Sequence, residues 1–194
     1  VEPADPNASP YGWHDTDGVI GPEYTITRGN NVYAKEDDEG DGSMSGIDYS
    51  PDGGTSLTFN FDNTNLDQPP AGYMDLAITN LFYTNNMMHD IWYRYGFDEI
   101  SGNFQENNYG NGGQGSDSVN ADGQDGSGFN NASFGTPPDG QNPQMTMFLW
   151  ILSTSKSKYD PPCKSRPRFT FFFKKKSSLL IKLEILKNIK ERQK

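Results

Sequence analysis

One segment, residues 75–97, constrains the fold more than any other part of this 194-residue chain. Its apolar residues recur at the spacing of one broad helix face. Asp75 places a negative charge near the first turn, where the helix dipole favours it, and Gly96 supplies a stop. We therefore predict a central core helix over residues 75–97, whose apolar face consists of Ile78, Leu81, Phe82, Met88, Ile91, Trp92 and Tyr95.

The rest of residues 1–150 is typical of short strands joined by loops. We predict strands at residues 24–27 and 31–34, and the alternation of Leu57, Phe59 and Phe61 with polar residues predicts another. We expect regular structure again over residues 129–134, and we predict a further strand at residues 145–150 from their alternation of side chains. The abundant Gly, Asn, Asp and Pro between these segments favour turns. The fold class is therefore predicted as α+β, a β-rich domain with one long core helix.

Two long segments carry turn-forming residues instead of a strand pattern. Residues 1–22 predict an extended N-terminal strip that Tyr11 and Trp13 pin to the core. Residues 101–128 are rich in Gly, Asn, Gln, Ser and Asp, so they are either mobile or held by neighbouring structure.

The composition changes abruptly near Trp150. Residues 1–150 hold three basic residues against 23 acidic ones, a net charge of −20, whereas residues 151–194 hold 13 basic and three acidic ones, a net charge of +10. All 21 glycines precede the change. We interpret residues 1–150 as the folded domain and residues 151–194 as an unstructured or weakly helical tail that arises from a frameshift or read-through.

Several classes of partner are disfavoured by the same composition. No apolar run approaches the roughly 20 residues of a membrane span, so we predict no membrane partner. The basic tail could contact nucleic acid, but an unselected sequence accounts better for its composition, and we predict no nucleic-acid partner. Cys163 is the single cysteine, which excludes an intrachain disulfide. The polar first residues and Val1 in place of a methionine lead us to expect no signal peptide here and a processed protein or a fragment.

Five blocks of residues 1–150 resemble, in order, the fungalysin family of secreted zinc metallopeptidases: residues 8–14, Asn80–Tyr93, Gly102–Asn108, Asp125–Ala132 and Met145–Trp150. The resemblance implies a catalytic region similar to that of thermolysin, with a sheet-rich first half, a zinc-binding helix and a helical second half. It implies a secreted, extracellular enzyme that hydrolyses protein or peptide substrates with zinc-activated water. This chain would then be the N-terminal part of that region.

The sequence departs from the family where the zinc helix is expected, a few tens of residues beyond Trp150. That helix carries His-Glu-x-x-His, in which two histidines one turn apart bind zinc. Here only His14 and His89 occur, 75 positions apart. We therefore predict no catalytic residue and no metal ligand in this chain, and inactivity without the missing C-terminal half. His89 is interpreted as a structural residue.

The candidate substrate site is the sequence Asn130-Asn131-Ala132. The resemblance implies an edge strand that hydrogen-bonds to the extended substrate, with Asn131 contacting substrate amides and Ala132 offering its main chain. The alternative is that the two asparagines merely cap a turn.

Calcium is the second cofactor to consider. Residues 36–42, Glu-Asp-Asp-Glu-Gly-Asp-Gly, could wrap a calcium ion, since hard cations take oxygen ligands from flexible loops. Their spacing does not match an EF-hand, so the pattern favours a solvated acidic loop. The alternative function is accordingly a non-catalytic secreted module, β-rich, that binds calcium or peptides.

Overall fold

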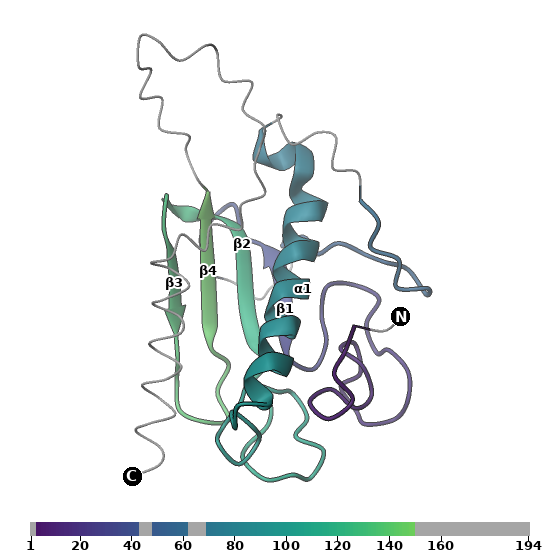
Figure 1. The fold of residues 1–194 in the computed structure, drawn as a ribbon. Helices are drawn as coiled ribbons and strands as arrows, with labels where there is room; N and C mark the ends of the chain where they lie inside the picture. Colours follow the sequence, from purple (N-terminus) through teal and green to yellow (C-terminus); the bar gives the residue numbers. More distant parts are fainter. Residues whose placement is uncertain (1–2, 43–47, 62–68, 150–194) are drawn as a thin grey trace, which may run out of the picture.

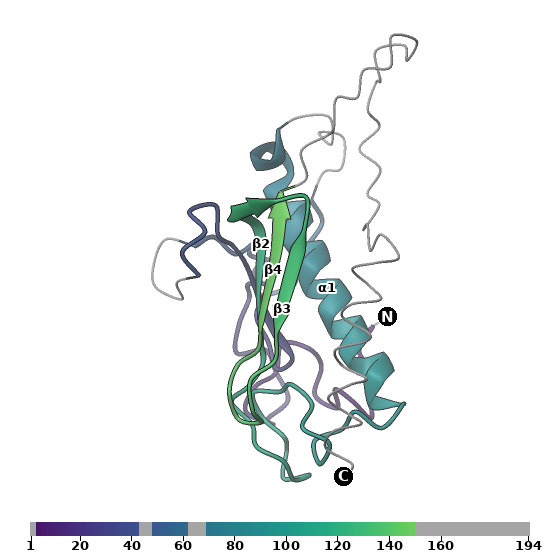
Figure 2. The same ribbon diagram turned by 90° about the vertical axis from the view of Figure 1, so that its left-hand side faces the viewer.

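The computed structural model describes residues 3–42, 48–61 and 69–149, which form one helix packed along a four-stranded sheet (Figure 1). A 3₁₀ turn, η1 (Pro70–Tyr73), leads directly into helix α1 (Met74–Tyr93). The strands are β1 (Val32–Glu36), β2 (Val119–Phe129), β3 (Ala132–Gly135) and β4 (Gln144–Leu149). The turned view in Figure 2 shows α1 running along one face of the sheet.

The sheet is mixed, and its strand order is β1-β2-β4-β3. β1 pairs with β2 and β2 pairs with β4 in parallel, whereas β3 returns antiparallel to β4 and lies at the edge. The β2–β4 register shifts after Gly123, next to Gln124, whose φ is 53°. Such a bulge bends a strand and strengthens its twist.

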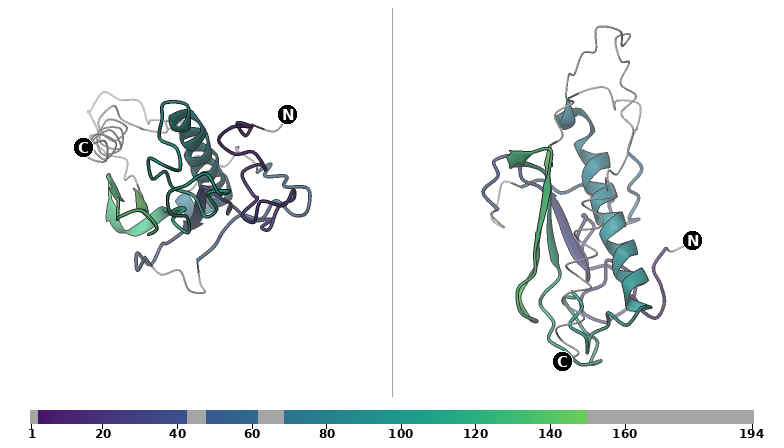
Figure 3. Two further views of the ribbon diagram at one scale, coloured as in Figure 1. Left: turned by 90° about the horizontal axis from the view of Figure 1, so that it is seen from below. Right: turned by 60° about the vertical axis from the view of Figure 1, so that its left-hand side comes forward.

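The core lies between α1 and the β1–β2 half of the sheet. Small residues on the strands let the helix approach closely, and a Cβ added to Gly123 would lie 2.5 Å from Ile78 Cδ1. The buried apolar side chains that pack together are Trp13, Val32, Ala34, Ile78, Leu81, Phe82, Val119, Ala121 and Met145. Figure 3 shows the N-terminal strip beside α1 and β1, on the opposite side of the molecule from β3.

The predicted helix is confirmed, with bounds of 74–93, but its buried stripe differs from the prediction. Ile78, Leu81 and Phe82 are buried as expected, whereas Ile91 is 42% and Tyr95 is 78% exposed. The stripe continues instead through Asn86 and Asp90. The prediction was wrong in the second half of the helix because polar side chains fill the buried positions there.

The strand predictions were partly confirmed. Residues 31–34 correspond to β1, 145–150 to β4, and 129–134 to the end of β2 and most of β3. Residues 24–27 make only an isolated bridge, Ile26 to Asp52. The prediction at Leu57–Phe61 was wrong: Leu57 has a φ of 49° at the end of a turn, and the Phe59 ring stacks on His14 at 5.5 Å.

Neighbouring structure holds the segment 101–128, one of the two alternatives for it. Its last ten residues belong to β2, and buried polar side chains anchor the loop before them. The Asp117 carboxylate accepts the N–H groups of Gln105 at 2.9 Å and Gly140 at 3.1 Å. The predicted strip fits as well, since Trp13 is buried in the core, although Tyr11 is 40% exposed. The tail, 151–194, lies outside the described residues.

Candidate functional site

The three predicted site residues lie together where β2 turns into β3. Asn130 adopts a φ of 55°, a left-handed conformation that asparagine tolerates better than most residues. Its N–H donates to the Leu149 carbonyl at 2.9 Å, and the Phe148 N–H donates to the Asn131 carbonyl at 3.3 Å. Main-chain hydrogen bonds therefore fasten the turn to the end of β4, while both asparagine side chains remain exposed.

The register of β3 on β4 decides which main-chain groups of β3 are free. Antiparallel neighbours alternate between hydrogen-bonded and non-hydrogen-bonded pairs. Since the carbonyl of Asn131 points to β4, the next residue, Ala132, forms a non-hydrogen-bonded pair with Met147. Its N–H and C=O therefore point to the opposite edge, as do those of Phe134. Among the described strands, none pairs with that edge.

The side chains of β3 alternate in exposure along this edge. Ser133 and Gly135 are exposed, whereas Ala132 and Phe134 are half-buried, and the Phe134 ring packs beside Phe104 at 6.0 Å. The strand is thus anchored by its inner face and by β4. An open, anchored edge strand can accept an extended chain as an additional strand.

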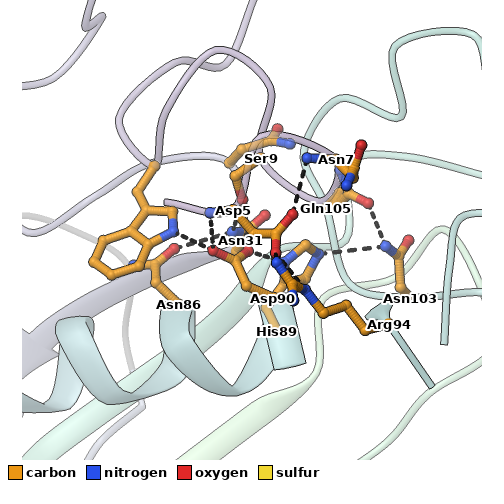
Figure 4. A network of polar contacts seen from close by, with 12 residues as sticks. Asp5, Asn7, Ser9, Asn31, Asn86, His89, Asp90, Arg94, Asn103 and Gln105 are labelled. Carbon is orange, nitrogen blue, oxygen red and sulfur yellow. Dashed lines mark hydrogen bonds and ion pairs between the residues drawn. The ribbon is translucent and has the colours of Figure 1, made fainter. Parts of the chain in front are cut away.

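His89 belongs to a polar network around a buried carboxylate of α1, which Figure 4 shows from close by. Its Nδ1 lies 3.0 Å from the Asp90 carboxylate, and its Nε2 lies 3.3 Å from the Asn103 amide nitrogen. Asn103 also donates to Gln105. Because the carboxylate accepts from Nδ1–H, Nε2 is the acceptor for the amide, and both ring nitrogens are used.

Asp90 is the centre of this network and is 5% exposed. Its Oδ2 accepts the Asp5 N–H at 2.9 Å and the Trp13 indole N–H at 2.8 Å, and its Oδ1 accepts the Ser9 hydroxyl at 2.8 Å. Burial raises the pKa of Asp90, but the hydrogen bonds from His89, Asp5, Trp13 and Ser9 outweigh it, so the pKa lies below its usual value. The network fastens the N-terminal strip to α1.

A second group of buried carboxylates lies where β1 ends beside the middle of β2. Asp37, Asp122 and Asp125 are at most 2% exposed, and one carboxylate oxygen of each lies within 4.8 Å of the others. The buried Lys35 ammonium lies 3.2 Å from Asp122 and also pairs with Asp48. Burial raises the pKa of Asp122 to about 6; Lys35 opposes this shift, and Asp37 and Asp125 add to it.

The predicted acidic loop is therefore only partly solvated. Asp38, Glu39 and Asp41 are exposed, but Glu36 and Asp37 are buried. The Asp37 carboxylate accepts the N–H groups of Gly40, Asp41 and Gly42 at 2.9–3.2 Å.

Comparison with known proteins identifies the family of this chain. The sequence profile of the fungalysin metallopeptidase (M36) family matches residues 1–161. The chain belongs to the fungalysin family. This fungalysin chain is 46% identical to the extracellular metalloproteinase MEP of Pyricularia oryzae over 154 residues. Those residues are 79% of the chain and 24% of that relative.

Two further relatives give the same result. Extracellular metalloproteinase 2 of Trichophyton tonsurans is 47% identical over 147 residues, which are 76% of the chain and 22% of the relative. Probable extracellular metalloproteinase 2 of Arthroderma benhamiae is 49% identical over 145 residues, 75% and 22% respectively. The fungalysin chain thus spans about a quarter of the length of these relatives. The family match continues past Trp150, the boundary that the composition predicts.

The fungalysin fold thus brings Asn130, Asn131 and Ala132 together at an open edge. Neither histidine belongs to that edge: His14 lies in the N-terminal strip and packs against Phe82 of α1, and His89 lies on α1. In the described residues, every group of three or more metal-ligating side chains consists of carboxylates alone. No helix among the described residues is long and apolar enough to cross a membrane.

Sequence reasoning missed the network around Asp90 and the carboxylates of β2. A signal for the first existed, because Asn86 and Asp90 follow Ile78 and Phe82 at four-residue steps. No local signal identified the second, since Asp37 and Asp122 meet only through the parallel pairing of β1 with β2.

Proposed function

We propose that this chain is the N-terminal part of the catalytic region of a secreted zinc metalloendopeptidase, and that β3 binds the substrate as an added strand. The observation that carries the proposal is the open edge at which the main-chain groups of Ala132 and Phe134 face away from β4. Such an edge binds an extended peptide through its main chain, whatever the sequence. The names of the relatives support extracellular proteolysis.

Two features support a role for the residues before Ala132. The Asn131 side chain is exposed next to the open edge, and its main chain is already engaged by β4. Its amide is therefore free to bind a main-chain group of the peptide, while Asn130 shapes the turn with its left-handed conformation. If the two asparagines only capped a turn, neither side chain would need to lie beside the open edge.

The described residues do not fit a catalytic zinc ion. Such a site needs three protein ligands, usually with histidine among them. Both nitrogens of His89 are engaged, and His14 Nδ1 lies 3.0 Å from the Arg28 carbonyl. The chain contains no third histidine. We propose that the 194 residues by themselves hydrolyse no peptide bond, and that the C-terminal half of the catalytic region supplies the ligands of the zinc ion.

Activity is tested with the purified chain, casein and added Zn²⁺, with and without a chelator. We expect no chelator-sensitive cleavage of casein. Chelator-sensitive cleavage by the 194-residue chain would refute this part of the proposal.

The substrate edge is tested by titrating an end-capped hexapeptide into the ¹⁵N-labelled chain. We expect saturable shifts at the amides of Ala132 and Phe134. Asn131→Ala removes one hydrogen bond and should weaken binding roughly threefold to tenfold. Ser133→Ala is the matched control, because this residue is also exposed on β3 but its main chain is paired with Thr146. Equal affinity for both variants would contradict a role of Asn131.

The second candidate function is a non-catalytic secreted module that binds calcium or peptides. The group of Asp37, Asp122 and Asp125 favours it, since one oxygen of each carboxylate lies within 4.8 Å of the others. An assay on a longer product of the same gene distinguishes the two candidate functions. Peptide binding without chelator-sensitive cleavage in that product would favour the module.

A further inference from the structure

We propose that Asp15, Asp17 and Glu23 form a calcium site in the N-terminal strip, separate from the β3 edge and from the group of Asp37, Asp122 and Asp125. One carboxylate oxygen of each residue lies within 4.8 Å of the other two. Calcium is a hard cation that binds clusters of carboxylate oxygens and completes its shell with main-chain carbonyls and water.

The buried member of the trio lacks a partner for one oxygen. Asp15 is 1% exposed, and its Oδ2 accepts no hydrogen bond although it has almost no contact with solvent. Its Oδ1 is engaged, with the Gly18 N–H at 2.9 Å and the Tyr109 hydroxyl at 3.2 Å. A buried carboxylate oxygen without a donor costs free energy unless a cation binds it.

The charges around Asp15 point the same way. The charged side chains that act on it are Glu23 and Asp17, both negative. Burial raises the pKa of Asp15, hydrogen bonds from Gly18 and Tyr109 oppose the rise, and the two carboxylates add to it. The site differs in this respect from the cluster of β1 and β2, where the ammonium of Lys35 already supplies a positive charge.

The exposed members leave room for water in the coordination shell. Asp17 and Glu23 are exposed, whereas Asp15 anchors the trio to the segment after α1 through Tyr109. Asn107 ties the same segment to the Thr16 carbonyl at 3.2 Å. A bound ion would therefore stabilise the part of the strip that is hydrogen-bonded to residues 107–109. Exposed calcium sites of extracellular modules have dissociation constants of about 0.1–1 mM, and we expect that range here.

Terbium luminescence and calorimetry on the full chain test the proposal. Tb³⁺ replaces Ca²⁺, and the nearby Tyr109 ring should sensitise its emission. We expect saturable Ca²⁺ binding with about one ion lost in the double variant Asp17→Asn, Glu23→Gln, which changes only exposed groups. At 10 mM Ca²⁺ the wild-type melting temperature should rise by about 3–8 °C, and that of the variant should not.

The matched control is Asp38→Asn with Glu39→Gln, an exposed pair in the acidic loop. It should bind Ca²⁺ through the Asp15 group as tightly as the wild type. Binding that disappears in this control but survives in the Asp17/Glu23 variant would overturn the assignment. So would the absence of saturable binding up to 10 mM Ca²⁺, or saturation by Mg²⁺ and not by Ca²⁺.

Discussion

The Asp90 network gives the sharpest test of how this fold is held together. In Asp90→Asn a carboxylate that accepts four hydrogen bonds becomes an amide with one acceptor oxygen, and its NH₂ group faces buried donors. Hydrogen bonds to a charged group contribute about 1.5–3 kcal/mol each. If the remaining oxygen keeps two of them, the free energy of unfolding should fall by about 3–5 kcal/mol. That is a large fraction of the stability of an ordinary domain.

Urea denaturation followed by tryptophan fluorescence measures this change. Asp75→Asn is the matched control on the same helix, where loss of a charge near the first turn should cost at most about 1 kcal/mol. The pH dependence provides a second readout. Because the folded-state pKa of Asp90 is lowered, its contribution is present above the unfolded pKa, near 3.8, and is lost as the pH falls through the folded value. Equal stability of the two variants would refute the reasoning.

Two further perturbations follow from packing and from burial. Gly123→Ala places a methyl group 2.5 Å from Ile78 Cδ1 and should cost about 1–3 kcal/mol, measured by urea denaturation. Gly135→Ala meets nothing within 4 Å and should change stability by at most about 0.5 kcal/mol, so a larger effect there would contradict the packing argument. Burial lowers the pKa of His14, so the unfolded state binds the proton more tightly and stability should fall as the pH drops through about 6.5. The NMR titration of the His14 ring checks this, and a midpoint above 6.5 would contradict it.

The fold class could be predicted because its signals are local. The helix at 74–93 is a long stretch with apolar periodicity, and β4 is a short, mostly apolar segment interrupted by Thr146. β2 escaped prediction, since glycine and aspartate disfavour strands in isolation. It forms in the centre of the sheet because pairing on both sides stabilises it, and because Gly123 lets α1 pack closely.

Of the candidate site, too, the sequence predicts one part and only the tertiary structure decides the other. The resemblance to fungalysins identifies Asn130, Asn131 and Ala132 from the sequence, whereas their main-chain directions depend on the register of β3 against β4. The surroundings of Asp15 likewise include Tyr109, 94 positions away, whose hydroxyl donates to Asp15 Oδ1.

The amino-acid sequence by itself determined the family, the helix and the charge contrast at Trp150, because motif, periodicity and composition are properties of neighbouring residues. Only the tertiary structure decided which edge of the sheet is open and which carboxylates meet. Hydrogen-bond direction and burial arise from segments far apart in the chain, so no local pattern specifies them.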